Sequence, residues 1–437
     1  MPAAPIAALP CRCRRTHRRA RVHLRAGFLS LLFVAWSATA PAWAQESGPT
    51  TRTEAIEQER REKIARLWPE HENPLVKTVN NLVERGFREG LDSGRGHNGL
   101  QLVLGGTRSG HGTSAGLGYG RYDLWRERLG VRSTLRGTIQ GAYLVDADVR
   151  FQSFGFARGF LNLYSKYESS PKMDYYGQGT NSDVGNRTSY RLNDFTTDWR
   201  FGIEPVRHLR FGFTGGYLTT DTGPGHRSGV PSIEHVFDST TAPGLGDDSQ
   251  FTRWGGFAVF DWRDKRSGPR HGGLLGAQFR RYLDVDKKTY TYRETQLDAQ
   301  YYIPYFNDSR VIALRASSTL TFRGEDQLVP YYLQPTLGGN DDLRGFSRYR
   351  FTDNNVLFMS AEHRWLVFNG LDMALFADAG KVAPNKSELN FADLKFSAGL
   401  GLRVRFFDAI VSRIDFAAGR EGFRWMWTFS DIYHGRW

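Results

Sequence analysis

Polar and apolar residues alternate along most of this chain, from Asn98 almost to its end. Residues 395–406 are a clear case, because Lys, Ser, Gly and Arg occupy one set of alternate positions and Phe, Ala, Leu and Val the other. Residues 294–303 and 312–322 follow the same rule. Since successive side chains of a β-strand point to opposite faces of a sheet, this period of two predicts amphipathic strands.

About sixteen such segments follow one another, separated by glycine-rich or polar turns. Turns after even-numbered segments are short, such as 206–208 and 369–370, whereas several turns after odd-numbered segments are long, notably 169–187, 221–248 and 324–354. The predicted strands span 98–107, 112–123, 128–139, 141–153, 157–168, 188–204, 207–220, 249–263, 271–285, 289–305, 309–323, 355–369, 371–383, 393–406, 411–419 and 423–433.

Alternation alone also fits a soluble β-sandwich, so other features must decide the fold class. The polar faces carry full charges in one segment after another, as expected beside a wet lumen, and aromatic residues gather near strand ends, as in a lipid-facing band. After residue 44 the chain has no apolar run of about 18 residues, so it could cross a membrane only as a closed barrel. We therefore predict an all-β fold, a transmembrane antiparallel β-barrel over residues 98–437, in the outer membrane of a Gram-negative bacterium. Short turns on one side and long loops on the other predict that both termini lie in the periplasm.

Residues 1–44 have the layout of a secretory signal peptide, in which arginines precede an apolar stretch and Ala42-Trp43-Ala44 forms a cleavage site. The alternative is a membrane anchor helix, for which the apolar stretch is short. Removing residues 1–44 lowers the net charge from +12 to +5, since they hold seven arginines and no acidic residue, and it removes both cysteines. The basic character of the chain is therefore largely a targeting feature, and we predict no nucleic-acid partner.

Residues 45–97 are interpreted as a periplasmic helical leader, so that a short helical segment precedes the barrel. Charged residues at helical spacing run from Thr53 to Leu67, and an amphipathic stretch runs from Pro74 to about Gly90. This leader is either a solvated segment or a helix that docks at the rim or in the lumen of the barrel.

Signals for catalysis are weak. Residues 112–116 match the G-x-S-x-G pattern of serine hydrolases. That pattern needs a strand–turn–helix in an α/β domain, whereas here it lies in a predicted hairpin. The histidines show no metal-ligand spacing, and no phosphate-binding loop is present. We predict no catalytic residue, no metal site and no cofactor.

Five short motifs occur in a fixed order along the chain. They are Tyr175-Tyr176-Gly177-Gln178-Gly179, Asp261-Trp262-Arg263-Asp264, the loop from Gly338 to Phe346, Ser360-Ala361-Glu362-His363-Arg364, and the segment from Phe376 to Val382. Together they resemble the bacterial surface antigen family. These are outer-membrane barrels related to the central subunit of the barrel assembly machinery, to translocation-and-assembly proteins and to two-partner-secretion transporters. The resemblance covers about residues 98–437.

The loop motif Arg344-Gly345-Phe346 has a counterpart in that family, where the loop folds into the lumen and its arginine meets acidic residues of the barrel wall. The resemblance implies that Arg344 pairs with Glu362 and Asp378. The alternation agrees, since Glu362 and Asp378 both fall on the polar faces of their predicted strands. A guanidinium between two shielded carboxylates would be a strong and oriented contact. The alternative is that Arg344 is a solvated loop charge.

The segment 420–427 is similar to the C-terminal assembly signal of outer-membrane barrels, with Gly422 followed by the spaced aromatics Trp425 and Trp427. Such a signal implies capture by the barrel assembly machinery through edge pairing during insertion of this protein. The usual terminal phenylalanine is absent. An aromatic girdle on the last strand is an equally good interpretation.

The resemblance implies a barrel that helps proteins or lipids enter or cross the outer membrane. Its expected partners are outer-membrane lipids, lipopolysaccharide, and client outer-membrane proteins or lipids. Residues 45–97 are too short to hold even one of the periplasmic transport-associated domains with which relatives capture clients, so we expect a short branch of the family. A passive pore or structural barrel that has lost the assembly role is the alternative. A surface adhesin that uses the 221–248 loop is a third interpretation.

Overall fold

The computed structural model describes residues 52–66 and 98–429, except 106, 109–111, 113, 156–157, 369 and 407–408. The chain divides into two units, Met1–Ala65 and Arg66–Trp437. The first contains all but the last residue of helix α1 (Arg52–Arg66), which confirms the short N-terminal helix expected from Thr53 onward. The signal peptide predicted for residues 1–44 and the amphipathic stretch 74–90 lie outside the described residues. Among the helices that are described, none is both long and apolar enough to cross a membrane.

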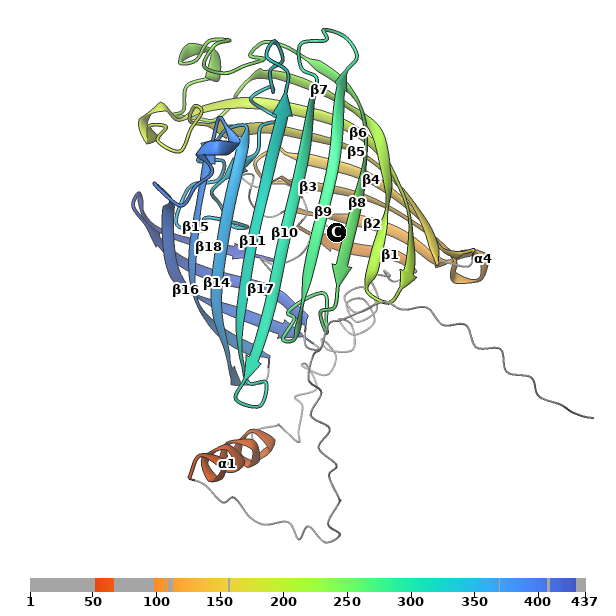
Figure 1. The fold of residues 1–437 in the computed structure, drawn as a ribbon, viewed down its shortest axis with the longest axis vertical. Coiled ribbons are helices and arrows are strands. Elements are labelled where there is room, and N and C mark those ends of the chain that lie inside the picture. Colours follow the sequence, from red (N-terminus) through yellow and green to blue (C-terminus); the bar gives the residue numbers. More distant parts are fainter. Residues whose placement is uncertain are drawn as a thin grey trace, which may run out of the picture. The chain divides into compact units, whose positions relative to one another are not determined.

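The second unit confirms the predicted antiparallel sheet of sixteen strands, which curves into a barrel (Figure 1). Each strand pairs with its neighbour in the chain, and β11 is followed in the sheet by β14. The strands are β1 (Gly99–Leu104), β2 (Ser114–Asp123), β3 (Leu129–Thr138), β4 (Tyr143–Phe154), β5 (Gly159–Tyr175), β6 (Thr188–Val206), β7 (Leu209–Pro224), β8 (Ser249–Asp261), β9 (Gly272–Asp284), β10 (Tyr292–Tyr305), β11 (Arg310–Arg323), β14 (Asn355–Phe368), β15 (Leu371–Ala383), β16 (Lys395–Phe406), β17 (Ala409–Gly419) and β18 (Gly422–Thr428).

The smaller elements lie in the connections. β12 (Thr336–Leu337) and β13 (Phe351–Thr352) pair as a separate sheet inside the connection between β11 and β14. The helical turns are α4 (Leu124–Glu127), η2 (Val184–Asn186), η3 (Ile233–His235) and η4 (Lys386–Glu388).

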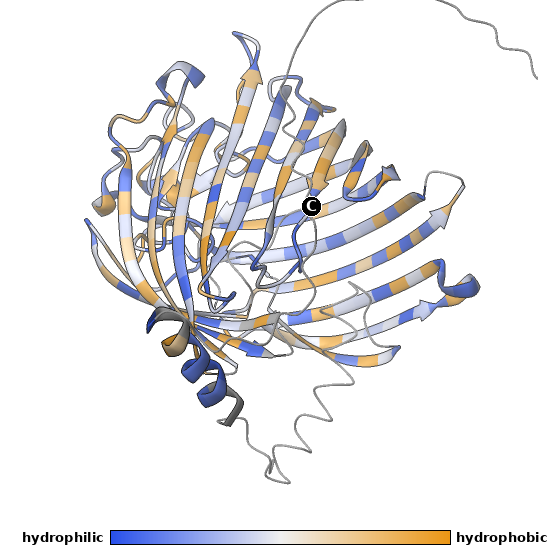
Figure 2. Cartoon of the chain, turned by 60° about the horizontal axis from the view of Figure 1, so that its bottom comes forward, coloured by the Kyte–Doolittle hydropathy of each residue, from blue (hydrophilic) through white to orange (hydrophobic). Residues whose placement is uncertain are grey.

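Hydrophilic and hydrophobic residues alternate along many strands of the barrel wall (Figure 2), and the exposures of their side chains differ between the two faces. Large apolar side chains are exposed on the outward face, including Leu100 at 77% and Phe213 at 66%. Charged side chains such as Glu168 and Asp298 are buried on the inward face. Apolar exposure of this kind suits a face covered by lipid, since the hydrocarbon layer replaces water there.

Two central strands continue well past the ends that the alternation predicted. β5 continues to Tyr175, whereas a loop was expected from residue 169, and β7 continues to Pro224. The ladder between β5 and β6 shifts register between Ser170 and Met173, next to Pro171. Proline lacks the N–H that a ladder needs, so the pairing shifts around it and then resumes.

The strands at the two ends of the sheet are the shortest of the sixteen. β1 has 6 residues and β18 has 7. Among the described residues, no hydrogen-bonded ladder joins β1 to β18. We call this junction the seam. Its two strands pair only with β2 and β17.

Aromatic side chains form a core where the long connections meet. Tyr175, Tyr190 and Tyr331 are buried, and the ring of Tyr331 contacts those of Tyr175 and Tyr190 at centroid distances of 5.3 and 4.9 Å. Ile233 of the β7–β8 connection packs in the same cluster. We call this side of the barrel the long-loop end, and the side with the short connections the short-turn end.

Candidate lumenal site at the Arg344 loop

The connection between β11 and β14 carries the predicted loop motif on a small hairpin. β12 and β13 form its base, and two glycines with positive φ, Gly338 at +114° and Gly339 at +126°, follow β12 directly. Residues with a side chain rarely adopt such backbone angles, so glycine allows the chain to turn there. Asp342 accepts hydrogen bonds from the backbone N–H groups of Gly338 and Leu343, both at 2.7 Å. These turns and hydrogen bonds therefore fix the backbone conformation of the loop from Asn340 to Phe346, which we call the Arg344 loop.

Arg344 is completely buried and binds Asp378 of β15 through two parallel hydrogen bonds. Its Nε donates to Oδ2 at 2.8 Å and its Nη2 donates to Oδ1 at 2.7 Å. Its Nη1 donates to Glu362 Oε2 of β14 at 2.9 Å. The guanidinium also lies over the ring of Phe376, with Cζ 3.3 Å from the centroid. The structure thus brings together the three residues that the family resemblance paired.

Glu362 is shared by several arginines. Arg403 of β16 donates to both of its oxygens, at 3.1 and 2.9 Å, and Arg364 donates to Oε1 at 2.7 Å. Asp415 of β17 adds a further negative charge, at 2.6 Å from Arg403 Nη1 and 3.8 Å from Arg344 Nη1. Every one of these charges has an opposite charge in contact, which is the condition under which buried ions are tolerated.

Gly345 allows the loop to touch the barrel wall. A Cβ atom at this position would lie 2.6 Å from the Cβ of Ser397 and 2.9 Å from the backbone of Ala418. Real carbon atoms do not approach so closely, so any side chain at Gly345 would push the loop away from β16 and β17. The need for glycine here comes from space, since its φ angle is not in the left-handed region.

Phe346 anchors the loop by packing. It is 1% exposed and lies in a cluster with Leu343 and Phe358. Its ring meets that of Phe351 in a T-shaped contact, with centroids 5.2 Å apart. Burial of a phenylalanine contributes about 1.5–3 kcal/mol. The loop is therefore held by one apolar anchor beside its charged one.

Further ion pairs and hydrogen bonds fasten the loop to the last strands of the barrel. Arg413 of β17 donates to Asp341 Oδ1 at 2.9 Å, and Arg424 of β18 donates to Ser347 Oγ at 3.0 Å. Arg350 donates to Glu421, in the turn between β17 and β18, at 2.7 Å. With the contacts to β14, β15 and β16, the loop crosses the inner faces of strands β14 to β18.

The motif Tyr175-Tyr176-Gly177-Gln178-Gly179, the first of the five, lies next to the base of this loop. Gly179 donates its N–H to the carbonyl of Thr352 in β13 at 2.9 Å. Thr180 accepts a hydrogen bond from the N–H of Val382 at 3.0 Å. The cation of Arg350 lies 5.0 Å from the ring centroid of Tyr176. Motifs that are far apart in the sequence therefore meet around β13.

Several residues of the network were not singled out from the sequence. Arg403, Arg413 and Asp415 are at most 1% exposed and complete the charge balance around Arg344. Alternation could have placed Arg403 and Asp415 on lumenal faces. Their pairing depends on the register Gly401↔Asp415 and Arg403↔Arg413, which the sequence pattern does not specify.

The residues of the predicted C-terminal signal lie in and beside β18. Gly422 begins the strand with a φ of +120°. Trp425 and Trp427 are 66% and 52% exposed on the outward face, and Trp427 Nε1 donates to Ser412 Oγ at 2.8 Å. This placement is compatible with an aromatic girdle and with an assembly signal alike.

Two further sequence features can be placed. Ser114, from the G-x-S-x-G match, is the first residue of β2 in the barrel wall. Over the described part of the chain, the side chains of His, Cys, Asp and Glu do not gather in any group of three that could hold a metal ion.

Comparisons with protein families and with solved structures both give matches, and the family match covers most of the barrel. The Omp85 superfamily domain matches residues 102–417. BamA from Haemophilus ducreyi, in a structure that lacks POTRA domains 1–3, has a TM-score of 0.55 and 15% identity, covering 76% of this chain and 70% of that chain. CdiB from Escherichia coli has a TM-score of 0.48 and 14% identity, covering 75% of this chain and 61% of that chain. No curated protein sequence matches the chain.

Proposed function

The chain belongs to the Omp85 superfamily of outer-membrane barrels, and we propose that it assists the insertion or translocation of proteins or lipids at the outer membrane. In this proposal its termini lie in the periplasm, the long-loop end faces outward, and the outward apolar faces contact membrane lipids and lipopolysaccharide. The proposed route is the seam between β1 and β18.

The observation that carries the proposal is the state of the seam. In the described residues the outer edges of β1 and β18 carry no ladder. An unpaired edge presents backbone N–H and C=O groups that can pair with an added strand. Within a membrane this pairing is strongly favoured, because hydrocarbon offers the backbone N–H and C=O groups no other hydrogen-bond partner. A client strand could therefore be templated on this edge.

β1 is also weakly held on its other side. Three of its six partners in β2 are glycines, namely Gly116, Gly118 and Gly120. Glycine contributes no side chain to a cross-strand pair and weakens the strand that contains it. We therefore assign the mobile side of the seam to β1.

The opposite side of the seam is cross-braced. The loop that carries Arg344 contacts β14, β15, β17 and β18 through the ion pairs and hydrogen bonds described above, and β16 through the close approach of Gly345 to Ser397. Such a brace would keep β18 in place while β1 moves. In this proposal the loop supports the seam and does not itself touch the client.

The passive-pore alternative has one observation in its favour. A cavity of about 700 Å³ remains in the lumen beside β3 to β9. A barrel that retained only this space could conduct solutes without inserting anything. The two functions differ in whether client folding or solute leakage depends on the protein.

The test is the folding rate of an unfolded client barrel added to liposomes that contain the purified protein. We expect faster folding than in empty liposomes. The Arg344→Ala variant should lose the acceleration, because β18 is then no longer braced. Arg253→Ala is the matched control, since Arg253 is also a buried lumenal arginine with one carboxylate partner, Asp198, at 2.7 Å.

Variants that insert incompletely would confuse the result, so folding is first checked by the heat-dependent gel mobility typical of barrels. Arg344→Lys keeps the charge without the planar fork and provides a second, milder variant. Equal acceleration by wild type and both Arg344 variants would remove the bracing role. Solute leakage without any acceleration would favour the passive pore.

Amide hydrogen exchange tests the seam directly. We expect the amides of β1 to exchange much faster than those of β5 and β6, which have 17 and 19 residues and pair with a neighbouring strand on each side. Protection of β1 over hours, at the level of β6, would rule out an opening seam.

A further inference from the structure

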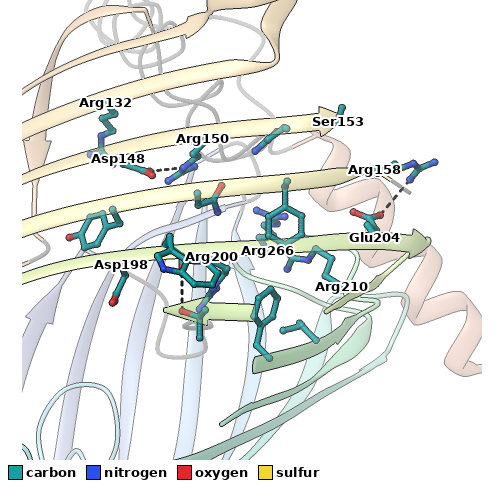
Figure 3. A pocket seen from close by; sticks show the side chains of 18 of the residues that line it. Arg132, Asp148, Arg150, Ser153, Arg158, Asp198, Arg200, Glu204, Arg210 and Arg266 are labelled. Carbon is teal, nitrogen blue, oxygen red and sulfur yellow. Dashed lines mark hydrogen bonds and ion pairs between the residues drawn. The ribbon is translucent and has the colours of Figure 1, made fainter. Parts of the chain in front are cut away.

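A cavity of about 700 Å³ lies within the barrel, against the lumenal faces of strands β3 to β9 (Figure 3). A second cavity of about 520 Å³ shares Arg158, Glu204, Arg210 and Arg266 with it and is otherwise lined by residues at the short-turn end. The shared residues show that the two cavities are adjacent. We call the larger one the arginine cavity.

The lining of the arginine cavity is unbalanced in charge. It contains seven arginines and four carboxylates, an excess of three positive charges. The arginines are Arg132, Arg150, Arg158, Arg200, Arg210, Arg266 and Arg280, and the carboxylates are Asp146, Asp148, Asp198 and Glu204.

All four carboxylates are already engaged. Asp148 accepts from Arg150 at 2.6 Å, and Glu204 accepts from Arg158 at 3.5 Å, as the dashed lines in Figure 3 mark. Asp198 pairs with Arg253 at 2.7 Å. Asp146 pairs with Arg136. Two of the four acids thus neutralise arginines that do not line the cavity.

The remaining five arginines have no carboxylate within ion-pair distance among the described residues. They come from β3, β6, β7, β9 and the β8–β9 turn. Arg200 lies near the like charges of Arg280 and Arg210, whose repulsion exceeds the attraction of the nearby Asp198. Arg210 is repelled by Arg266 and attracted by Asp261 and Glu204, neither of which is within ion-pair distance of it. Arranging like charges in a shared space costs free energy, and a bound anion would offset that cost.

Aromatic rings support part of this cluster. The guanidinium of Arg200 lies over the ring of Phe257, with Cζ 4.7 Å from the centroid. The ring of Phe160 is 6.2 Å from that of Phe257. A guanidinium stacked in this way keeps its N–H groups in the plane at its edge, where they are available for a ligand.

We propose that the arginine cavity binds a phosphate-bearing ligand. Arginine matches the geometry of phosphate oxygens with two parallel hydrogen bonds, and a doubly charged oxyanion balances the excess better than a single carboxylate. The volume falls within the range of small-ligand sites, about 300–1,000 Å³. This site is separate from the seam, so it does not rest on the proposed insertion role.

Calorimetric titration of sodium pyrophosphate into the full chain in zwitterionic detergent, at low ionic strength, tests the proposal. We expect saturable binding that weakens as salt is added. The double variant Arg200→Gln/Arg210→Gln should bind about 100-fold more weakly, since two charge-assisted contacts are lost. Arg293→Gln is the matched control, because Arg293 is exposed and lies on β10 on the opposite face from the lumenal Glu294.

The source of the phosphate is decided by competition. Displacement of pyrophosphate by lysophosphatidate, but not by lysophosphatidylcholine, would identify a lipid phosphate monoester. Displacement by inorganic phosphate alone would identify a free phosphate. Both results support the site, provided that the double variant abolishes them and keeps the heat-dependent gel mobility of a folded barrel.

Three results would overturn the proposal. One is the absence of pyrophosphate binding to the folded wild type, and another is equal affinity of the wild type and the double variant. The third is binding of polyglutamate without binding of pyrophosphate, which would point to acidic polypeptide as the ligand. Equal losses in Arg293→Gln and the double variant would show general attraction to a basic protein and would count against the site as well.

Discussion

Two groups of arginines inside the same barrel meet opposite surroundings. Around the Arg344 loop, Arg344 and Arg403 are fully buried, and each touches at least two carboxylates. In the arginine cavity, Arg200 and Arg210 have no carboxylate partner among the described residues and repel each other. Arginines thus hold the loop in place in one part of the lumen, whereas in another part they line an open, positively charged cavity.

The difference separates two kinds of charged cluster in a barrel lumen: a balanced ion-pair network that holds the protein together, here called a lock, and an open site that can bind an anion. A balanced network satisfies itself, so its energy depends on keeping every member. An unbalanced cluster is satisfied only by something added. The stability of the barrel should therefore change in opposite directions when an arginine is removed from one group or from the other.

The largest effect should come from Arg344→Ala. Its removal leaves Glu362 and Asp378 buried at 1% exposure without the guanidinium that joins them. Loss of one member of a buried ion pair typically costs about 3–5 kcal/mol. Urea unfolding in detergent micelles measures the change. Double removal, in Arg344→Ala/Asp378→Ala, should cost less than the sum of the two single changes, because the stranded charge is removed with its partner.

An unchanged urea midpoint for Arg344→Ala would contradict the lock. It would mean that the loop is held by Phe346 and the backbone alone. The variant Phe346→Ala separates these contributions, since it removes packing and leaves the ion pairs in place.

Gly345→Ala should have the next largest effect. The added methyl group would meet Ser397 and the backbone of Ala418 at 2.6 and 2.9 Å, so the loop must move away from β16 and β17. Overpacking of this kind costs about 1–3 kcal/mol. Gly324→Ala is the matched control, because the nearest atom to an added Cβ there is Gln327 Cγ at 3.4 Å. Equal stability of the two variants would show that the close approach is not needed.

A buried carboxylate with no cation in ion-pair contact among the described residues is the opposite case to the arginines of the arginine cavity. Asp353, between β13 and β14, is 3% exposed and accepts a hydrogen bond from the N–H of Asn354 at 2.8 Å. Burial, assisted by the charge of Glu388 and opposed by Arg323, raises the pKa of Asp353 to about 6. In an unfolded chain the pKa is about 3.9.

Because the folded-state pKa is the higher one, the folded protein binds this proton more tightly than the unfolded chain. The contribution to stability is therefore greatest below about pH 4 and decreases as the pH rises through about 6. We expect a loss of about 1–2 kcal/mol between pH 4.5 and 7.5. Asp353→Asn should raise the urea midpoint at pH 7.5 and change it little at pH 4.5. A variant effect that does not depend on pH would exclude titration of Asp353 as the cause.

Much of the fold could be predicted from the sequence, because alternation is a local property of each strand. Sixteen strands, their antiparallel order and the short helix near Thr53 were all expected and are confirmed. The β12–β13 hairpin was not expected, since its strands have two residues each and show no periodicity. Residues 169–187 were expected to form a loop, whereas β5 continues to Tyr175 past a register shift beside Pro171, where the period of two is interrupted.

The charged interior was harder to predict. Alternation could assign Arg403, Asp415 and Arg200 to lumenal faces, but which charges meet depends on the register between strands and on the path of the loop. The excess of arginine in the cavity is a property of strands β3 to β9 together. Whether the first and last strands pair depends likewise on how the whole sheet closes. The residues of a single strand carry little information about that.

The smallest predicted effect separates the two groups of arginines most clearly. Arg200→Gln/Arg210→Gln removes two like charges on neighbouring strands and leaves no carboxylate without its partner, since Asp198 remains bound to Arg253. Relief of the repulsion between their like charges should stabilise the barrel by at most about 1 kcal/mol, so the urea midpoint should rise slightly, whereas every substitution at Arg344 lowers it. Added pyrophosphate should raise the midpoint of the wild type and leave that of the double variant unchanged. A fall in the midpoint of the double variant without ligand would mean that Arg200 and Arg210 stabilise the wall, and the contrast between a balanced lock and an open anion site would fail.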